Sequence, residues 1–198
     1  MNGDLTLTQG KTFSDVVRWE QPMIVYKPVS AIAQSAPMRL TVPAHGVPNG
    51  WRVALTGAKG MPDINATANA VQDTDYHTAT VVDADTLELN DVNAAGFKAY
   101  LGGGILQYNA PVDLTGYRAR MTIKDKIGGL ELLSLTTENG GITLDTANYT
   151  LTRTIDAVTT AALPWKTGVY DLEAVALGGQ VYSLIPPSKV TVSPEVTT

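Results

Sequence analysis

The chain has 198 residues, of which 44% are apolar and 17% are charged, a balance typical of a globular protein with a sparsely charged surface. Its formal charge of −5 and its scattered Lys and Arg residues argue against a nucleic-acid partner, because phosphate binding needs clustered basic side chains. The lack of cysteine excludes disulfides, thiolate metal sites and cysteine nucleophiles.

The first residues of the chain give no sign of export or of membrane insertion. Residues 1–11 lack the basic start and the apolar run of a signal peptide. No apolar stretch approaches the roughly 20 residues that a bilayer-spanning helix needs. We therefore expect the protein to be made in a cytoplasm and to have no membrane partner.

Short strands separated by turn residues are the dominant pattern along the chain. Leu5 and Leu7 alternate with threonines ahead of a Gln-Gly turn, which predicts a first strand whose free edge could pair with a partner chain. Residues 65–71, rich in alanine and asparagine, are expected to form a loop or a single helical turn. The other predicted strands cover residues 13–19, 23–26, 39–42, 51–56, 77–82, 86–89, 105–108, 117–123, 130–135, 142–144, 149–155, 169–177, 181–184 and 189–192.

One short helix interrupts this pattern. Asp156 can cap it and Pro164 cannot continue it, so the helix should cover residues 156–163. So many short strands with regularly spaced turns predict an all-β fold. We expect an antiparallel, immunoglobulin-like β-sandwich that carries an inserted small β-barrel or meander module.

The boundaries of this insert are predicted from glycine punctuation. Tyr100 is followed by glycine at residues 102–104, a flexible run that we interpret as the exit from the module. The predicted outer β-sandwich domain is therefore discontinuous and comprises residues 1–35 and 105–198. The inserted β module comprises residues 36–104.

The sequence offers little for catalysis. His45 and His77 are its two imidazoles, and they lie in different segments without ligand spacing, one in a turn beside a glycine and one on an alternating strand. Phosphate loops, nucleophile elbows and zinc-protease motifs are all missing from the sequence. We therefore predict that the protein is not an enzyme and holds no cofactor.

Clustered aspartates are weak candidates for a cation site. Asp-x-Asp occurs twice, as Asp73 with Asp75 and as Asp83 with Asp85, and calcium favours such clustered oxygen ligands. Aspartate also populates turns, and no calcium-loop spacing continues from either pair. We predict no bound metal.

Aromatic residues of the insert suggest a sugar platform. Trp51, Tyr76 and Tyr100 are the candidates, because aromatic rings are suited to stacking on sugars. Trp51, however, starts an alternation with Val53 and Leu55, which predicts that its side chain faces the core.

One set of residues in the insert resembles a module of tailed bacteriophages. The matching residues are His45, Gly46, Asn49, Gly50, Val53, Gly57, Gly60, Met61, Asn65, the hairpin at residues 80–89, and Tyr100 before Gly102 and Gly103. This module is common in phage structural proteins and often carries the label of the first catalytic-cysteine half-domain of ubiquitin-activating enzymes. The label implies no such activity here, because that chemistry needs a cysteine.

The outer domain resembles small phage virion proteins. The matching stretches are residues 113–121 (DLTGYRARM), 139–142 (NGGI), 162–165 (ALPW) and 168–173 (GVYDLE). These are turn and core residues, so the resemblance specifies a fold more than a site. Similar sandwich domains in upper baseplate proteins dock onto a tail and hold receptor-binding proteins.

This resemblance implies a non-enzymatic structural component of a tailed-phage virion, most simply a tail or baseplate adaptor linking the tail to fibres or receptor-binding proteins. Its partners would be other virion proteins and copies of itself. The candidate interface residues are Leu5, Leu7, Tyr76 and Tyr100. Two alternatives remain open: a head decoration or head-to-tail component, and a carbohydrate-binding module that recognises host surface glycans through the insert.

Overall fold

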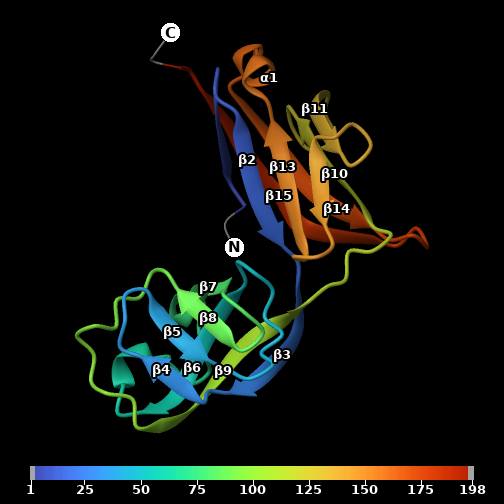
Figure 1. Cartoon of the computed structure of the whole chain (residues 1–198). Coiled ribbons are helices and arrows are strands. Elements are labelled where there is room, and N and C mark those ends of the chain that lie inside the picture. The colour runs from blue at the N-terminus through green and yellow to red at the C-terminus, as the bar shows by residue number, and fades with distance from the viewer. Residues whose placement is uncertain (1–2, 196–198) are drawn as a thin grey trace. The chain divides into compact units, whose positions relative to one another are not determined.

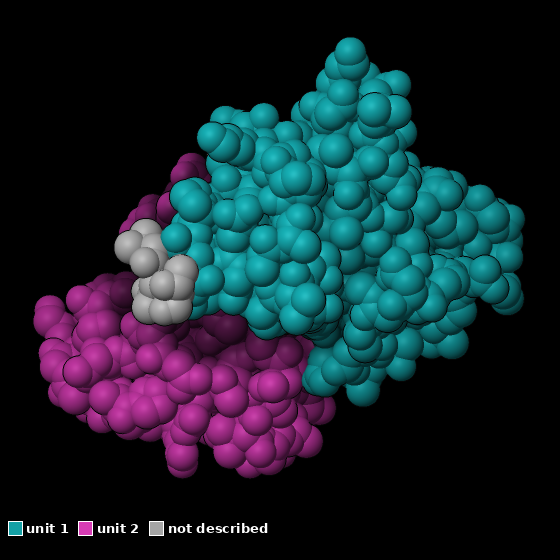
Figure 2. Space-filling view, turned by 90° about the horizontal axis from the view of Figure 1, so that it is seen from above, with its two compact units in different colours: residues 1–19, 113–198 teal, residues 20–112 magenta. Residues whose placement is uncertain are grey.

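The computed structural model describes residues 3–195 and consists almost entirely of β-strands (Figure 1). The chain forms two compact units, coloured separately in Figure 2. Unit 1 comprises residues 1–19 and 113–198, and unit 2 comprises residues 20–112. The predicted all-β fold is confirmed, and the described residues contain one short α-helix.

Unit 1 is built from two sheets, with strand orders β1-β15-β14-β10-β11 and β12-β13-β2. Paired strands run antiparallel, except that β1 and β15 run parallel, with Leu5 opposite Val190 and Leu7 opposite Val192. The strands are β1 (Leu5–Thr8), β2 (Phe13–Arg18), β10 (Arg118–Lys124), β11 (Glu131–Thr136), β12 (Ile142–Asp145), β13 (Thr150–Ile155), β14 (Thr167–Val175) and β15 (Val181–Ser193).

The two sheets of unit 1 enclose one apolar core. Along β10 the buried and exposed residues alternate, so that Met121 and Ile123 face the other sheet and share one core with Leu151 of β13. Leu5 and Leu7 belong to the same core, with 9% and 0% of their surfaces exposed. These two predicted interface residues therefore use their side chains for packing, and what β1 offers a neighbour is the backbone of its outer edge and the exposed side chain of Thr6.

A buried arginine interrupts the apolar core of unit 1. Arg153 is 3% exposed, and its guanidinium lies over the rings of Phe13 and Tyr170, at 5.8 and 5.6 Å from their centroids. Its Nη2 pairs with the carboxylate of Asp15. The ion pair compensates the buried charge, as such a position requires.

In unit 1 the helix begins where it was predicted, whereas the last strands differ from the prediction. Helix α1 (Ala157–Ala161) begins at Asp156, whose side chain accepts a hydrogen bond from the backbone N–H of Thr159 at 2.6 Å, as predicted. The two strands predicted at residues 181–184 and 189–192 are instead one strand, β15. Its two prolines, at residues 186–187, coincide with a register shift against β14, where missing N–H donors are tolerated.

Unit 2 is a single antiparallel sheet with the order β3-β9-β6-β7-β8-β5-β4. Its two edge strands, β3 and β4, are separated by only two residues of chain, so the sheet must curl back on itself, and Figure 1 shows this curl. The strands are β3 (Glu20–Pro28), β4 (Ala31–Ala33), β5 (Met38–Thr41), β6 (Arg52–Lys59), β7 (His77–Val81), β8 (Thr86–Leu89) and β9 (Gly102–Pro111). Two 3₁₀ turns, Pro62–Ile64 and Asp73–Asp75, complete the unit.

The units divide at different places from the predicted domains. Residues 20–35 and 105–112, predicted to belong to the outer domain, lie in unit 2. The reason is strand pairing: β9 lies between β3 and β6, so both segments belong to one sheet.

The triple glycine is part of strand β9 and does not form the exit that was predicted. Gly103 pairs with Ala58 of β6, and Gly102 pairs with Lys59. Gly103 has a φ of 75°, and a Cβ there would lie 3.1 Å from the carbonyl oxygen of Gly57. Glycine is therefore needed for the backbone conformation and for the close approach of the neighbouring strand.

Candidate functional site

His45 is a structural residue of unit 2. Its ring is 2% exposed; Nδ1 accepts a hydrogen bond from the backbone N–H of Val47, and Nε2 donates to the carbonyl oxygen of Asp83, each at 2.9 Å. Tyr108 donates its hydroxyl to the His45 carbonyl at 2.9 Å. The imidazole thus joins the loop after β5 to the turn between β7 and β8, and both ring nitrogens are occupied.

Replacing His45 with alanine should destabilise unit 2 by about 2–3 kcal/mol, because the buried N–H of Val47 and the carbonyl of Asp83 both lose the imidazole as their partner. The control is His77→Ala. That ring is bonded to the Asp91 carboxylate at 2.7 Å near the surface, and its loss should cost under about 1 kcal/mol. Urea denaturation of both variants measures the difference. Equal effects would contradict the structural role of His45.

The carboxylates of the four candidate aspartates are already engaged in hydrogen bonds or ion pairs with other groups of unit 2. Asp73 pairs with Arg52 at 2.9 Å, and Asp85 accepts from the N–H of Ala44 at 2.7 Å. Asp83 accepts from the N–H of Asp85, and this hydrogen bond lowers the Asp83 pKa. Within residues 3–195, no group of three or more His, Cys, Asp or Glu side chains is placed to hold a metal ion.

The three candidate aromatic residues have different surroundings. Trp51 is fully buried, as predicted, and its Nε1 donates to the carbonyl oxygen of Asn109 at 2.7 Å. Tyr100 donates its hydroxyl to backbone carbonyls, that of Gly103 at 2.6 Å and that of Val29 at 3.2 Å, and so fastens the loop before β9. Of the three, Tyr76 is the one that borders a pocket.

This pocket lies on the outer face of β3, β9 and β6 and has a volume of about 500 Å³, within the range of small-ligand sites. Tyr26, Gln107 and Thr56 line its floor, since they are on the face of the sheet opposite to the buried Leu55 and Leu106. The loop at residues 66–71 and Tyr76 form a wall. We call it the unit 2 pocket.

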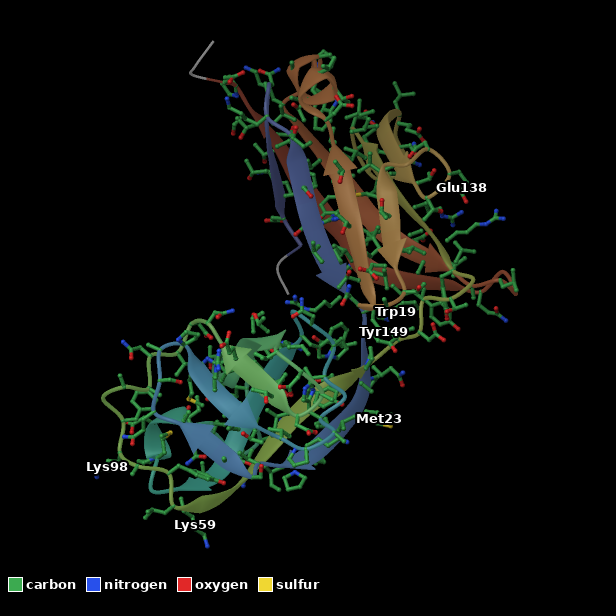
Figure 3. All side chains as sticks on the ribbon, in the orientation of Figure 1. Trp19, Met23, Lys59, Lys98, Glu138 and Tyr149 are labelled. Atoms are coloured by element: carbon green, nitrogen blue, oxygen red, sulfur yellow. The ribbon has the colours of Figure 1, made fainter. Side chains whose placement is uncertain are left out.

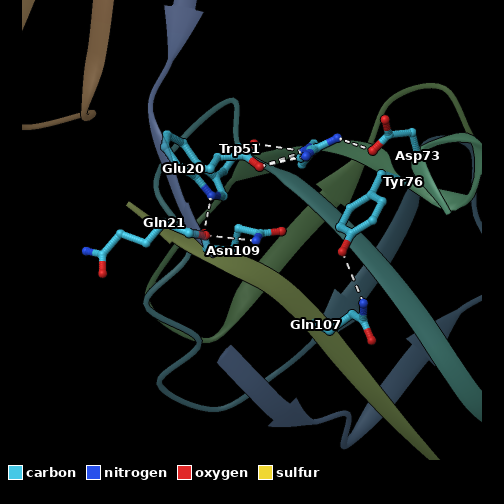
Figure 4. A network of polar contacts seen from close by, with 8 residues as sticks. Glu20, Gln21, Trp51, Asp73, Tyr76, Gln107 and Asn109 are labelled. Carbon is cyan, nitrogen blue, oxygen red and sulfur yellow. Dashed lines mark hydrogen bonds and ion pairs between the residues drawn. The ribbon is translucent and has the colours of Figure 1, made fainter. Parts of the chain in front are cut away.

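A polar network holds Tyr76 at this pocket (Figure 4). The guanidinium of Arg52 lies 4.9 Å from the centroid of the Tyr76 ring. Arg52 is fixed in turn by bidentate hydrogen bonds to the carboxylate of Glu20, at 2.7–2.9 Å. These hydrogen bonds are the main reason why the pKa of the Arg52 guanidinium is raised. At the other end of the ring, Gln107 Nε2 donates to the Tyr76 hydroxyl at 3.0 Å.

Asp75 fastens the loop that walls the pocket. One carboxylate oxygen accepts from the N–H and the hydroxyl of Thr67, and the other accepts from the N–H of Gln72, all at 2.9 Å. These hydrogen bonds, first that from Gln72, lower the pKa of Asp75 below its ordinary value. The ionised carboxylate therefore holds the loop at neutral pH, and the hold is lost as the pH falls through the lowered pKa.

Asp75→Ala should therefore speed amide hydrogen exchange in residues 67–72 at neutral pH, while the rest of unit 2 keeps its protection. Asp63→Ala is the control, because Asp63 is an exposed carboxylate of the neighbouring 3₁₀ turn. Unchanged exchange in the Asp75 variant would show that the loop is held by other contacts.

Unit 1 carries a second, smaller hollow of about 370 Å³ on the outer face of β10 and β14. Its lining holds charges of both signs, and Arg120 and Glu173 form an ion pair at 2.7 Å. Ile127, with 78% of its surface exposed, borders it. Because the charges of this lining are already paired and an exposed aliphatic side chain lies beside them, the hollow is better suited to contact another protein than to bind a small charged ligand.

Tyr26 and Gln107 are among the lining residues of the unit 2 pocket that sequence reasoning missed. Tyr26 lies in a short apolar run that gave no sign of which side chains face outwards, yet it is 60% exposed. Gln107, 7% exposed, alternates with the buried Leu106 and Tyr108, and a polar residue at that place in a buried strand is a signal that marks it.

No protein-family profile and no curated protein matches the sequence of this chain. In the described part of the chain, no helix is long and apolar enough to cross a membrane.

Proposed function

We propose that the protein is a non-enzymatic structural component of a tailed-phage virion, an adaptor of the tail or baseplate that joins other virion proteins and copies of itself. The motif resemblances in both parts of the sequence support this proposal. The structural observation that carries it is the placement of exposed aliphatic side chains at both ends of the larger sheet of unit 1.

One end of this sheet presents the turn between β10 and β11. Ile127 and Leu130 lie in that turn with 78% and 77% of their surfaces exposed. Isolated surface aliphatic residues are ordinary, but two in one turn beside a hollow form a local apolar patch. An interface with an apolar centre and a charged rim fits this arrangement.

The opposite end presents the hairpin between β14 and β15. Its Leu177 is 91% exposed and Tyr182 is 42% exposed. Because Lys124 pairs with Val169 and Arg118 with Val175, this hairpin lies at the other end of β10 from the Ile127 turn. Two apolar contact points at opposite ends suit a protein that connects two neighbours.

The hairpin also has a firm base. The ring of Trp19 lies 5.2 Å from that of Tyr182 and 5.4 Å, edge to face, from that of Tyr117. Contacts between aromatic rings at these distances stabilise the arrangement. The exposed Leu177 therefore projects from an ordered support, which reduces the entropy lost when a partner binds.

Two substitutions test the proposal in assembling particles. Leu177→Asp and Ile127→Asp should each reduce incorporation of the protein into particles at least about tenfold, because a charge enters the centre of a contact. Val158→Asp is the matched control, since Val158 is 81% exposed on α1 and belongs neither to the turn between β10 and β11 nor to the hairpin between β14 and β15. Equal incorporation of all three variants would show that neither patch contacts another protein of the particle.

Gold-labelled antibodies against the protein decide where it lies in a particle. Label on the tail or baseplate is the expected result, and label on the capsid would favour the alternative of a head decoration or head-to-tail component. A purified particle population that lacks the protein would contradict a virion role.

A further inference from the structure

The unit 2 pocket carries an inference that goes beyond the adaptor role and does not depend on it. Its chemistry is the starting point: among its lining residues, all of which the structure describes, none is Asp, Glu, Lys, Arg or His. A phosphate, a carboxylate or an ammonium group would find no opposite charge there. The ligand that fits this lining is neutral.

The lining combines flat apolar surfaces with hydrogen-bonding groups. Tyr26 and Tyr76 supply two aromatic rings, and alanine and valine side chains of the loop at residues 66–71 add small apolar contacts. Thr56, Asn69 and Gln107 supply hydroxyl and amide groups. An aliphatic peptide or lipid chain would leave these polar groups without partners, at a cost in binding free energy.

Gln107 is the most specific polar group of the pocket. Because only 7% of its surface is exposed, its amide is held in place by the sheet around it. Its Nε2 donates to the Tyr76 hydroxyl, and this leaves Oε1 as an acceptor for a donor inside the pocket. A ligand hydroxyl is a donor of the required kind.

The pocket is also formed in advance. Arg52, fixed by Glu20 and Asp73, covers the ring of Tyr76, and Gln107 binds its hydroxyl (Figure 4). Asp75 closes the loop that forms the wall. Little conformational entropy then remains to be lost on binding, which favours even a small and weakly held ligand.

We propose that the unit 2 pocket binds one ring of a neutral sugar. A pyranose has an apolar C–H face, which packs on a tyrosine ring, and a rim of hydroxyls, which exchange hydrogen bonds with amide and hydroxyl groups. Both requirements are met by Tyr26, Tyr76 and Gln107. The platform is therefore different from the one predicted from sequence, in which Trp51 and Tyr100 accompanied Tyr76.

Titration of the whole chain with methyl glycosides of glucose, galactose, mannose and N-acetylglucosamine, followed by amide NMR, tests the proposal. At least one neutral glycoside should bind with a dissociation constant on the order of 1 mM, as expected for a single small ring. Its shift changes should cluster at residues 24–26, 66–71, 76 and 107. Methyl glucuronide should bind at least about tenfold more weakly, since its carboxylate finds no cation.

A pair of variants on one strand separates the pocket from the rest of the surface. Tyr26→Ala should weaken binding about tenfold through the loss of a stacking ring. Met23→Ala should leave it unchanged, because Met23, labelled in Figure 3, is 59% exposed on the same strand and is not among the residues that line the pocket. Both residues are exposed, so both variants should keep the fold, which their amide spectra will show.

Three outcomes would overturn the sugar proposal. The first is the lack of any shift change with the four neutral glycosides up to roughly 50 mM, far above the expected dissociation constant. The second is binding that Tyr26→Ala leaves intact. The third is a cluster of shift changes outside the pocket. None of them bears on the location of the protein in a particle, so failure here is distinguishable from failure of the adaptor role.

Discussion

Deleting residues 20–112 and joining Trp19 to Asp113 through a short glycine linker should leave a folded unit 1. The main core cluster of that unit is built from residues 5–17 and 119–192, all of which the deletion keeps. The linker can be short, because Glu20 and Pro111 are paired across β3 and β9 and the two crossings of the chain lie side by side.

A shorter deletion, of residues 36–104, provides the contrast. It removes β6, the partner of β9, and keeps β3 with the end of β9 as an isolated ribbon. Leu106 and Tyr108, at 0% and 4% exposure in the intact protein, would then face solvent. We expect this variant to aggregate or to bind a hydrophobic dye, because two strands without a covering layer are not stable in water.

Light scattering, thermal melting and dye binding distinguish the two deletion variants. A monomeric, cooperatively melting product is expected from the long deletion only. If the short deletion gave the well-folded product and the long one did not, the division at residues 19/20 and 112/113 would be wrong.

Trp51→Ala should destabilise unit 2 by about 3–5 kcal/mol, the largest effect expected of a single substitution in this chain. Trp51 is fully buried, so its removal leaves a cavity, and the carbonyl of Asn109 loses its donor as well. Calorimetry should show a lower melting temperature for unit 2 and an unchanged transition for unit 1, because the two units have separate cores.

Trp51→Phe serves where the alanine variant is too unstable to purify. It keeps most of the volume and loses the indole N–H, so its effect should lie between those of the alanine variant and the unchanged chain. Tyr26→Ala is the control, since an exposed ring of unit 2 contributes little to the core. A Trp51 variant that shifted both transitions equally would show that the units unfold as one cooperative block.

Local patterns predicted most of the elements correctly. The alternation at residues 117–123 corresponds to β10, Arg118–Lys124, and the alternation at Leu5 and Leu7 corresponds to β1. Asp156 begins the helix because a side-chain cap needs only residues three positions away. These features are determined within a few residues of chain, so the sequence expresses them directly.

Pairing between distant strands was not predictable in the same way. The run of glycines at residues 102–104 is equally compatible with a flexible link and with a strand, and it is the contact of Gly103 with β6 that makes it a strand. The boundaries of the units follow from the same pairing. The pocket shows the same contrast between local pattern and distant pairing. Alternation along the chain correctly predicted that Trp51 is buried. Tyr26 and Tyr76 line one pocket only because β3 pairs with β9, and this pairing is not visible in the sequence.

The parallel pairing of β1 with β15 has a mechanical consequence. Tension that pulls the segment before Leu5 away from the segment after Ser193 would slide the two strands along each other, because they run in the same direction. The hydrogen bonds of this ladder would then bear the load together instead of opening one by one. Unit 2 lies in the chain between β2 and β10 and therefore outside the path of force from β1 to β15. It would carry no force until the pairing of β1 with β15 broke.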